Sequence, residues 1–120
     1  MGRFTGGDGC IYNIGYHVIW STTSRKVWTP KCRVKVLYGV YKGLVAECLL
    51  TKADELEVKI ENIEIMPDHI HLFIKCSPRH KISDIIGQLK GYSSYMVRKT
   101  YPWLYKYNNF WSSSYCEYFV

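Results

Sequence analysis

The sequence lacks the features that define several protein classes. Its five cysteines form no Cys-x-x-Cys pair, and their odd number supports neither a disulfide framework nor a zinc ribbon; they are Cys10, Cys32, Cys48, Cys76 and Cys116. No apolar run approaches the roughly 20 residues of a membrane span. The glycine-rich stretch over residues 2–9 has no apolar core of a signal peptide. These absences predict a cytoplasmic protein without a membrane partner.

Acidic residues are also scarce, and their distribution is uneven. Ten Asp and Glu oppose sixteen Lys and Arg, which gives a net charge of +6. Residues 22–43 hold six bases and no acid, and residues 69–107 hold seven bases and one acid, whereas seven acids lie between these two stretches in residues 44–68. A positive balance favours a polyanionic partner, with nucleic acid first. The two basic segments would form a groove for a phosphate backbone if they met in space, and are ordinary solvated surface otherwise.

The length and composition suit one domain. The chain has 120 residues, of which 48% are apolar, and a chain of this size buries a sufficient core without a metal or a disulfide. We therefore expect a single domain over residues 1–120 with a loose N-terminus over 1–10. Eleven Tyr, four Trp and four Phe supply aromatic side chains both for the core and for stacking on unpaired bases.

Apolar periodicity predicts six elements in the order β-α-β-β-α-β. The predicted strands are residues 12–20, 58–65, 69–76 and 110–120, and the predicted helices run from Thr29-Pro30 to Cys48 and over 83–100. The second strand changes phase near Glu61 and Asn62, which indicates a bulge. This order predicts an α+β protein with the split βαβ, ferredoxin-like arrangement, in which both helices cover one face of an antiparallel sheet and the other face is open.

Two histidines share the open face of the predicted third strand. His69 and His71 alternate with Ile70 and Leu72, so both imidazoles point away from the helices, about 6.6 Å apart at the backbone. That separation lets two imidazoles converge on one cation. Taken alone, the spacing is equally that of two surface histidines.

The surroundings of this pair resemble a known family. Residues 66–73 (MPDHIHLF) resemble the histidine-hydrophobic-histidine motif of the single-tyrosine HUH transposases, the small TnpA type of simple insertion sequences. Three further stretches resemble that family in the same order along the chain: residues 16–20 (YHVIW) followed by Arg25-Lys26, residues 90–94 (KGYSS) and residues 111–115 (WSSSY).

The resemblance implies a homodimer with a ferredoxin-like fold that cuts and joins single-stranded DNA beside hairpins, which is the chemistry of DNA transposition. In the family a tyrosine hydroxyl attacks the scissile phosphate and gives a phosphotyrosyl intermediate, which is nucleophilic catalysis. The same resemblance implies that His69 and His71 hold a divalent metal, Mg²⁺ or Mn²⁺, that polarises the phosphate. Two imidazoles suit Mn²⁺, whereas Mg²⁺ prefers oxygen ligands. Glu64 and Asp68 are further candidates for the metal shell, although structural roles are the alternative for both.

Three basic residues are candidate DNA contacts. Arg25 and Lys26 follow the first strand at the head of the basic block, and Lys90 lies beside Gly91, where the backbone allows close approach of a phosphate. Solvated surface is the alternative for each of these side chains.

The nucleophile is not assigned. In the family, the tyrosine lies on a helix after the fourth strand, and no counterpart of that helix is expected before Val120. The tyrosines that would have to substitute are Tyr92, Tyr95, Tyr115 and Tyr118, each of which has packing as its alternative role. A non-catalytic relic of the family that binds DNA hairpins therefore stays open, as does an RNA-binding domain of the RRM kind on the open sheet face.

Overall fold

The structure is a computed structural model that describes residues 5–6, 8–9, 14–23, 33–107 and 109–119. Its strands, helices and one 3₁₀ helix are, in chain order, β1 (Thr5–Gly6), β2 (Asp8–Gly9), β3 (Ile14–Ser21), α1 (Gly39–Glu55), β4 (Lys59–Met66), β5 (His69–Cys76), α2 (Ile82–Thr100), η2 (Pro102–Lys106) and β6 (Cys116–Phe119). Neither α-helix in these ranges is long and apolar enough to cross a membrane.

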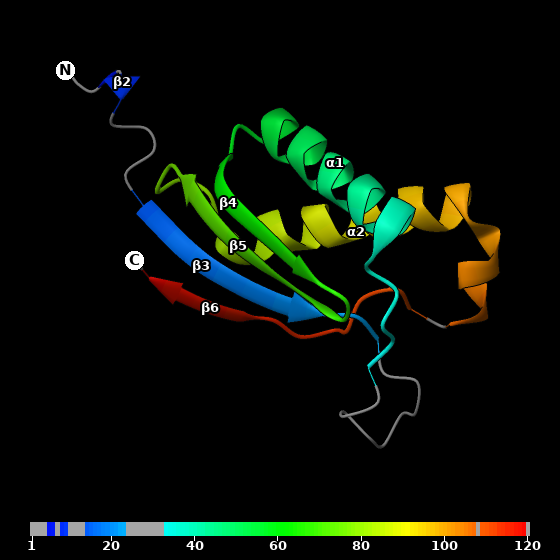
Figure 1. The fold of residues 1–120 in the computed structure, drawn as a ribbon. Helices are drawn as coiled ribbons and strands as arrows, with labels where there is room; N and C mark the ends of the chain where they lie inside the picture. The colour runs from blue at the N-terminus through cyan, green and yellow to red at the C-terminus, as the bar shows by residue number, and fades with distance from the viewer. Residues whose placement is uncertain (1–4, 7, 10–13, 24–32, 108, 120) are drawn as a thin grey trace.

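Four strands form the main sheet, in the spatial order β4-β5-β3-β6 with every neighbouring pair antiparallel. β1 and β2 pair only with each other, at the start of the chain. Figure 1 shows α1 and α2 together on one side of the sheet, with the other side uncovered. The predicted α+β, ferredoxin-like fold is therefore confirmed.

The core lies between the sheet and the two helices. α1 packs against α2 and against β4. Along β5 every second residue, beginning with Ile70, is buried, and the residues between them are half-exposed. The apolar residues that are almost fully buried come from the sheet and from both helices. They include Val18, Leu49, Leu72, Ile74, Ile86 and Leu89. The period of two along the central strands is what directs one set of side chains toward the helices.

The hairpin that carries the histidine pair contains the predicted bulge. The pairing of β4 with β5 shifts register between Ile60 and Asn62, which is the predicted bulge. Beyond it, Met66 pairs with His69 across a turn made by Pro67 and Asp68. The bulge changes the phase of β4, so that apolar residues on both sides of it face the helices.

The predicted start of the first helix is wrong. Thr29 and Pro30 lie outside the described residues, and α1 begins only at Gly39, where a φ of +55° suits glycine. Before it, Val34 and Val36 are buried while Lys35 is exposed, which is the alternation of extended chain. The amide of Val34 donates to the carbonyl of Thr23 (3.0 Å), so this segment pairs with another part of the chain instead of closing helical turns.

The last strand is shorter than predicted. Only Cys116–Phe119 forms β6, at the edge of the sheet beside β3. Phe110 and Trp111 are buried, and Trp111 makes an isolated bridge with Thr22. Phe110 and Trp111 therefore pack in the core and do not form part of a continuous strand.

The core position of α2 gives a stability prediction. Ile86→Ala removes a buried side chain and should lower the free energy of unfolding by about 2–5 kcal/mol. The exposed Leu50 on α1 is the matched control, because Leu50→Ala should change that free energy by less than about 0.5 kcal/mol. Urea unfolding followed by circular dichroism measures both, and equal effects at the two positions would contradict this packing.

Candidate metal and DNA site

β5 places both predicted metal ligands on the open face of the sheet. His69 and His71 are half-exposed, and Ile70 between them is fully buried. Their ring centroids lie 5.1 Å apart. Because β5 is paired on both edges along its length, neither histidine can turn toward the core without breaking the ladder.

Each of these imidazoles has a polar neighbour at its Nδ1 atom. Nδ1 of His69 lies 2.8 Å from Oδ1 of Asp68, and Nδ1 of His71 lies 3.4 Å from Nε2 of His17. A ring that gives Nε2 to a metal carries its proton on Nδ1 and donates it to such an acceptor, which is the usual arrangement around metal-bound histidine. In the tautomer with its proton on Nδ1, each ring would present Nε2 as the ligand atom.

His17 was not among the predicted site residues. It lies on β3, diagonally across from His71, with the two ring centroids 5.5 Å apart. The sequence does carry one signal for it, since strand periodicity puts His17 on the parity opposite to the buried Tyr16 and Val18. What the sequence lacks is the register of β3 against β5, which brings the three imidazoles together.

The two histidines fit a divalent ion as two of its ligands. Their shared face, their close rings and their oriented Nδ1 atoms meet that requirement. Among the described residues, no group of three or more His, Cys, Asp or Glu side chains is arranged to hold a metal ion. The rest of the coordination shell would therefore have to come from water, from phosphate oxygens or from another part of the protein.

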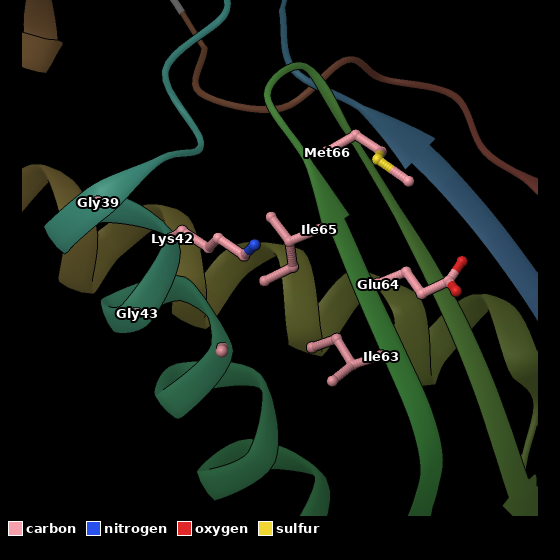
Figure 2. A pocket seen from close by; sticks show the side chains of 8 residues that line it. Gly39, Lys42, Gly43, Ile63, Glu64, Ile65 and Met66 are labelled. Carbon is pink, nitrogen blue, oxygen red and sulfur yellow. The ribbon is translucent and has the colours of Figure 1, made fainter.

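Glu64 and Asp68, the further candidates for the metal shell, both lie near this pair. Glu64 is the Cα partner of His71 across the ladder. Figure 2 shows its carboxylate pointing to the side of β4 away from α1, whereas Ile63 and Ile65 point toward the helix. Asp68 contacts His69 directly, with its Oδ1 atom 2.8 Å from Nδ1 of the ring.

A separate pocket of about 610 Å³ lies on the helix side of β4. Figure 2 shows its lining residues between the first turns of α1 and the edge strand, with the side chain of Lys42 reaching from α1 toward Ile65. Its walls are mostly apolar or glycine, and its lining residues are Gly39, Lys42, Gly43, Ala46, Ile63, Glu64, Ile65 and Met66. Its lining includes Glu64 and Met66, whose Cα partners on β5 are His71 and His69.

Lys90, a predicted DNA contact, is held by the chain itself. Its ammonium donates to the carbonyl oxygens of Ser112 (2.6 Å) and Ser114 (3.3 Å), and burial lowers the pKa of this lysine. One turn further along α2, the hydroxyl of Ser93 accepts a hydrogen bond from the indole nitrogen of Trp111 (2.9 Å). The two stretches KGYSS and WSSSY, which resemble the same family separately, therefore bind each other.

The other two predicted DNA contacts, Arg25 and Lys26, lie outside the described residues. Beside Lys90 the chain forms a shallow pocket of about 340 Å³. Its lining combines small residues of α2 with the segment before β6, namely Gly87, Lys90, Gly91, Ser94, Asn109, Phe110, Trp111, Ser112 and Ser113.

The candidate tyrosines occupy different surroundings. Tyr118 of β6 pairs with His17 across the ladder, is exposed, and has its ring centroid 6.3 Å from that of His17. Tyr115 packs against the core. Tyr92 and Tyr95 lie on α2, where each has a lysine over its ring. Of these four, Tyr118 is the tyrosine that the sheet places on the histidine face.

Comparison with known proteins defines the class as a transposase. The sequence profile of the family described as "Transposase IS200 like" matches residues 10–120. The ISDra2 transposase TnpA of Deinococcus radiodurans is 32% identical over 113 residues, which cover 92% of this chain and 75% of that protein. The transposase for insertion sequence element IS200 of Salmonella typhimurium is 32% identical over 102 residues, which cover 82% of this chain and 67% of that protein. The chain belongs to the IS200-like transposase family, which confirms the predicted family.

Solved structures agree with this assignment. A structure from Deinococcus radiodurans R1, assigned as a transposase, superposes with a TM-score of 0.80 at 29% identity and covers 100% of this chain and 86% of that chain. The REP-associated tyrosine transposase bound to a REP hairpin superposes with a TM-score of 0.60 at 12% identity, over 100% of this chain and 62% of that chain. The second likeness shows the shared fold.

The contacts of Lys90 predict a role in stability. Lys90→Met keeps the aliphatic stem but leaves two carbonyl oxygens without their donor, and should lower the free energy of unfolding by about 1–2 kcal/mol. Lys99→Met, at an exposed lysine of the same helix, is the control and should change it by less than about 0.5 kcal/mol. Unchanged stability in the Lys90 variant, together with weaker DNA binding, would instead assign Lys90 to the DNA.

Proposed function

We propose that this transposase carries out metal-dependent cleavage and strand transfer of single-stranded DNA at hairpin ends, with a divalent ion held by His69 and His71. The observation that carries the proposal is the histidine pair itself. Two imidazoles share the open face of the central strand β5, and each has its Nδ1 atom against a neighbour that leaves Nε2 for a ligand. The family assignment supplies the reaction class.

Two neighbouring side chains orient the imidazoles of His69 and His71. Asp68 holds the ring of His69, and His17 holds that of His71, so both imidazoles are preorganised before DNA arrives. Mg²⁺ or Mn²⁺ at this position would polarise a phosphate oxygen and stabilise the charge that develops there in the transition state. In the reaction, a tyrosine oxygen forms a bond to phosphorus as the bond to the 3′ or 5′ oxygen of the leaving strand breaks.

The expected partner is single-stranded DNA with hairpins. The net charge of +6 favours a polyanion, and the open face of the sheet leaves the histidine pair accessible. The fold match includes a protein whose solved structure holds a REP hairpin. We also expect a homodimer, on the basis of the family resemblance.

Metal binding gives the first test. His69→Ala combined with His71→Ala should abolish Mn²⁺ binding, measured by the loss of the free-ion electron paramagnetic resonance signal on titration with protein. Because both side chains lie on the open face, the fold should persist in circular dichroism. His80→Ala, in the loop before α2, is the matched control and should leave Mn²⁺ binding unchanged. Retained binding in the double variant would refute the metal site.

Strand cleavage gives the second test. The protein is incubated with Mn²⁺ and labelled single-stranded hairpin DNA from the ends of its own element, and a covalent adduct is scored on a denaturing gel and by mass spectrometry. We expect an adduct that depends on Mn²⁺ and on the histidine pair, because the metal activates the phosphate. Mapping the modified tyrosine identifies the nucleophile, and an adduct that persists in Tyr118→Phe excludes Tyr118.

The same experiment separates the alternatives. Tight hairpin binding without an adduct would contradict cleavage by this chain and favour a non-catalytic hairpin-binding relic of the family. Preferential competition by single-stranded RNA of the same sequence would favour an RNA-binding module on the open sheet face.

A further inference from the structure

The two basic segments of the sequence meet in the structure at a group of four aromatic rings. Tyr38 immediately precedes α1, and Tyr41 lies in its first turn. Tyr101 immediately follows α2, and Trp103 lies in η2. We name these four residues the aromatic junction. Figure 1 shows the beginning of α1 beside the end of α2, at the same end of the molecule.

Direct contacts connect the rings of the aromatic junction. The ring of Tyr41 lies 4.7 Å from that of Tyr101, 5.9 Å from that of Trp103 and 6.0 Å from that of Tyr38, all in edge-to-face geometry. The indole nitrogen of Trp103 donates to the hydroxyl of Tyr41 (3.2 Å). Tyr41 is thus the centre of the group and joins its two halves.

The two outer rings of the junction face solvent. Tyr38 is 58% exposed and Trp103 is 46% exposed, although both are large side chains that would gain from burial. An exposed aromatic ring whose partners fix its orientation offers a flat face at little cost in conformational entropy. Such faces are what unpaired bases stack on in proteins that bind single strands.

The two segments that supply the junction carry charge of one sign. No Asp or Glu occurs in residues 33–46 or 85–107, which supply all four rings. The ammonium of Lys106 lies 5.1 Å from the ring centroid of Trp103, and the exposed Lys35 lies three residues before Tyr38 in the chain. Aromatic faces with lysines beside them match a strand whose bases are free and whose phosphates need neutralising.

The aromatic junction is also linked to the turn that precedes the histidine pair. The amide of Leu37 donates to the carbonyl of Pro67 (2.9 Å), which places the residue before Tyr38 against the β4–β5 turn. His69 follows two residues after Pro67. A DNA strand that leaves the histidine face past this turn would therefore reach Tyr38 first.

We infer that the aromatic junction binds unpaired single-stranded DNA by stacking its bases on Tyr38 and Trp103, with Lys106 against its phosphates. This inference rests on the proposed function, because it names where the strand beyond the histidine site is held. Duplex DNA does not suit the junction, since its bases are already stacked. An apolar peptide does not suit it either, because the lysines would be desolvated.

The test is the binding of a fluorescein-labelled oligothymidine of about 20 nucleotides, which has no hairpin, followed by fluorescence anisotropy at several salt concentrations. Tyr38→Ala should weaken binding about tenfold through the loss of one stacked base, and leave the salt dependence unchanged. Tyr38→Phe keeps the ring and should retain the affinity. Lys106→Gln should weaken binding and also reduce the salt dependence, because it removes a phosphate contact.

Tyr95 provides the matched control for these variants. It is 56% exposed on α2, nearly as much as Tyr38, and makes no ring contact with the junction among the described residues. Tyr95→Ala should therefore leave the affinity unchanged. Trp103→Ala extends the series, with circular dichroism and urea unfolding used to confirm its fold, because Trp103 also contacts Tyr41.

The outcomes distinguish the junction from the proposed function. Oligothymidine binding that survives Tyr38→Ala and Trp103→Ala in folded protein overturns the junction alone. If Tyr38→Ala weakens binding but hairpin DNA gives no adduct with Mn²⁺, the junction stands and cleavage by this chain fails. A wild-type protein that binds no single-stranded DNA even at low salt overturns both.

Discussion

The structure depends on the alternation of side chains along a central strand that is paired on both edges. β5 cannot rotate about its axis or shift by one residue without placing Ile70, Leu72 and Ile74 in solvent, and burial of these side chains makes that shift costly. The same constraint sends His69 and His71 to the opposite face. The core thus positions the candidate metal ligands, although it does not contact them.

The second constraint on the structure is the path by which the chain returns to the sheet after α2. Lys90 and Ser93 bind the segment that contains Trp111 and Ser112, and these side-chain contacts add to the backbone hydrogen bonds that tie the segment to the end of β3. The strand β6 then pairs with β3 over all four of its residues. This arrangement is what brings Tyr118 beside His17.

Two surfaces with different chemistry result, and the β4–β5 turn lies between them. The open sheet face offers imidazoles and carboxylates, which suit a cation and the phosphate that it polarises. The aromatic junction offers rings and lysines, which suit bases and the phosphates between them. In the function that we propose, the first surface would promote chemistry and the second would hold a flexible strand near it.

The sequence by itself determined the order of the elements, the bulge in β4, the open-face position of His69 and His71, and the family, because these follow from local alternation and from motifs of adjacent residues. Its pattern predicted the start of α1 and the extent of the last strand wrongly. Val34 pairs with Thr23 and Trp111 pairs with Thr22, and apolar periodicity does not reveal such pairings between separate segments. Only the tertiary structure placed His17 beside His71 and Trp103 beside Tyr41. Those neighbours are 54 and 62 residues apart in the chain, and only strand register and helix packing bring them within contact.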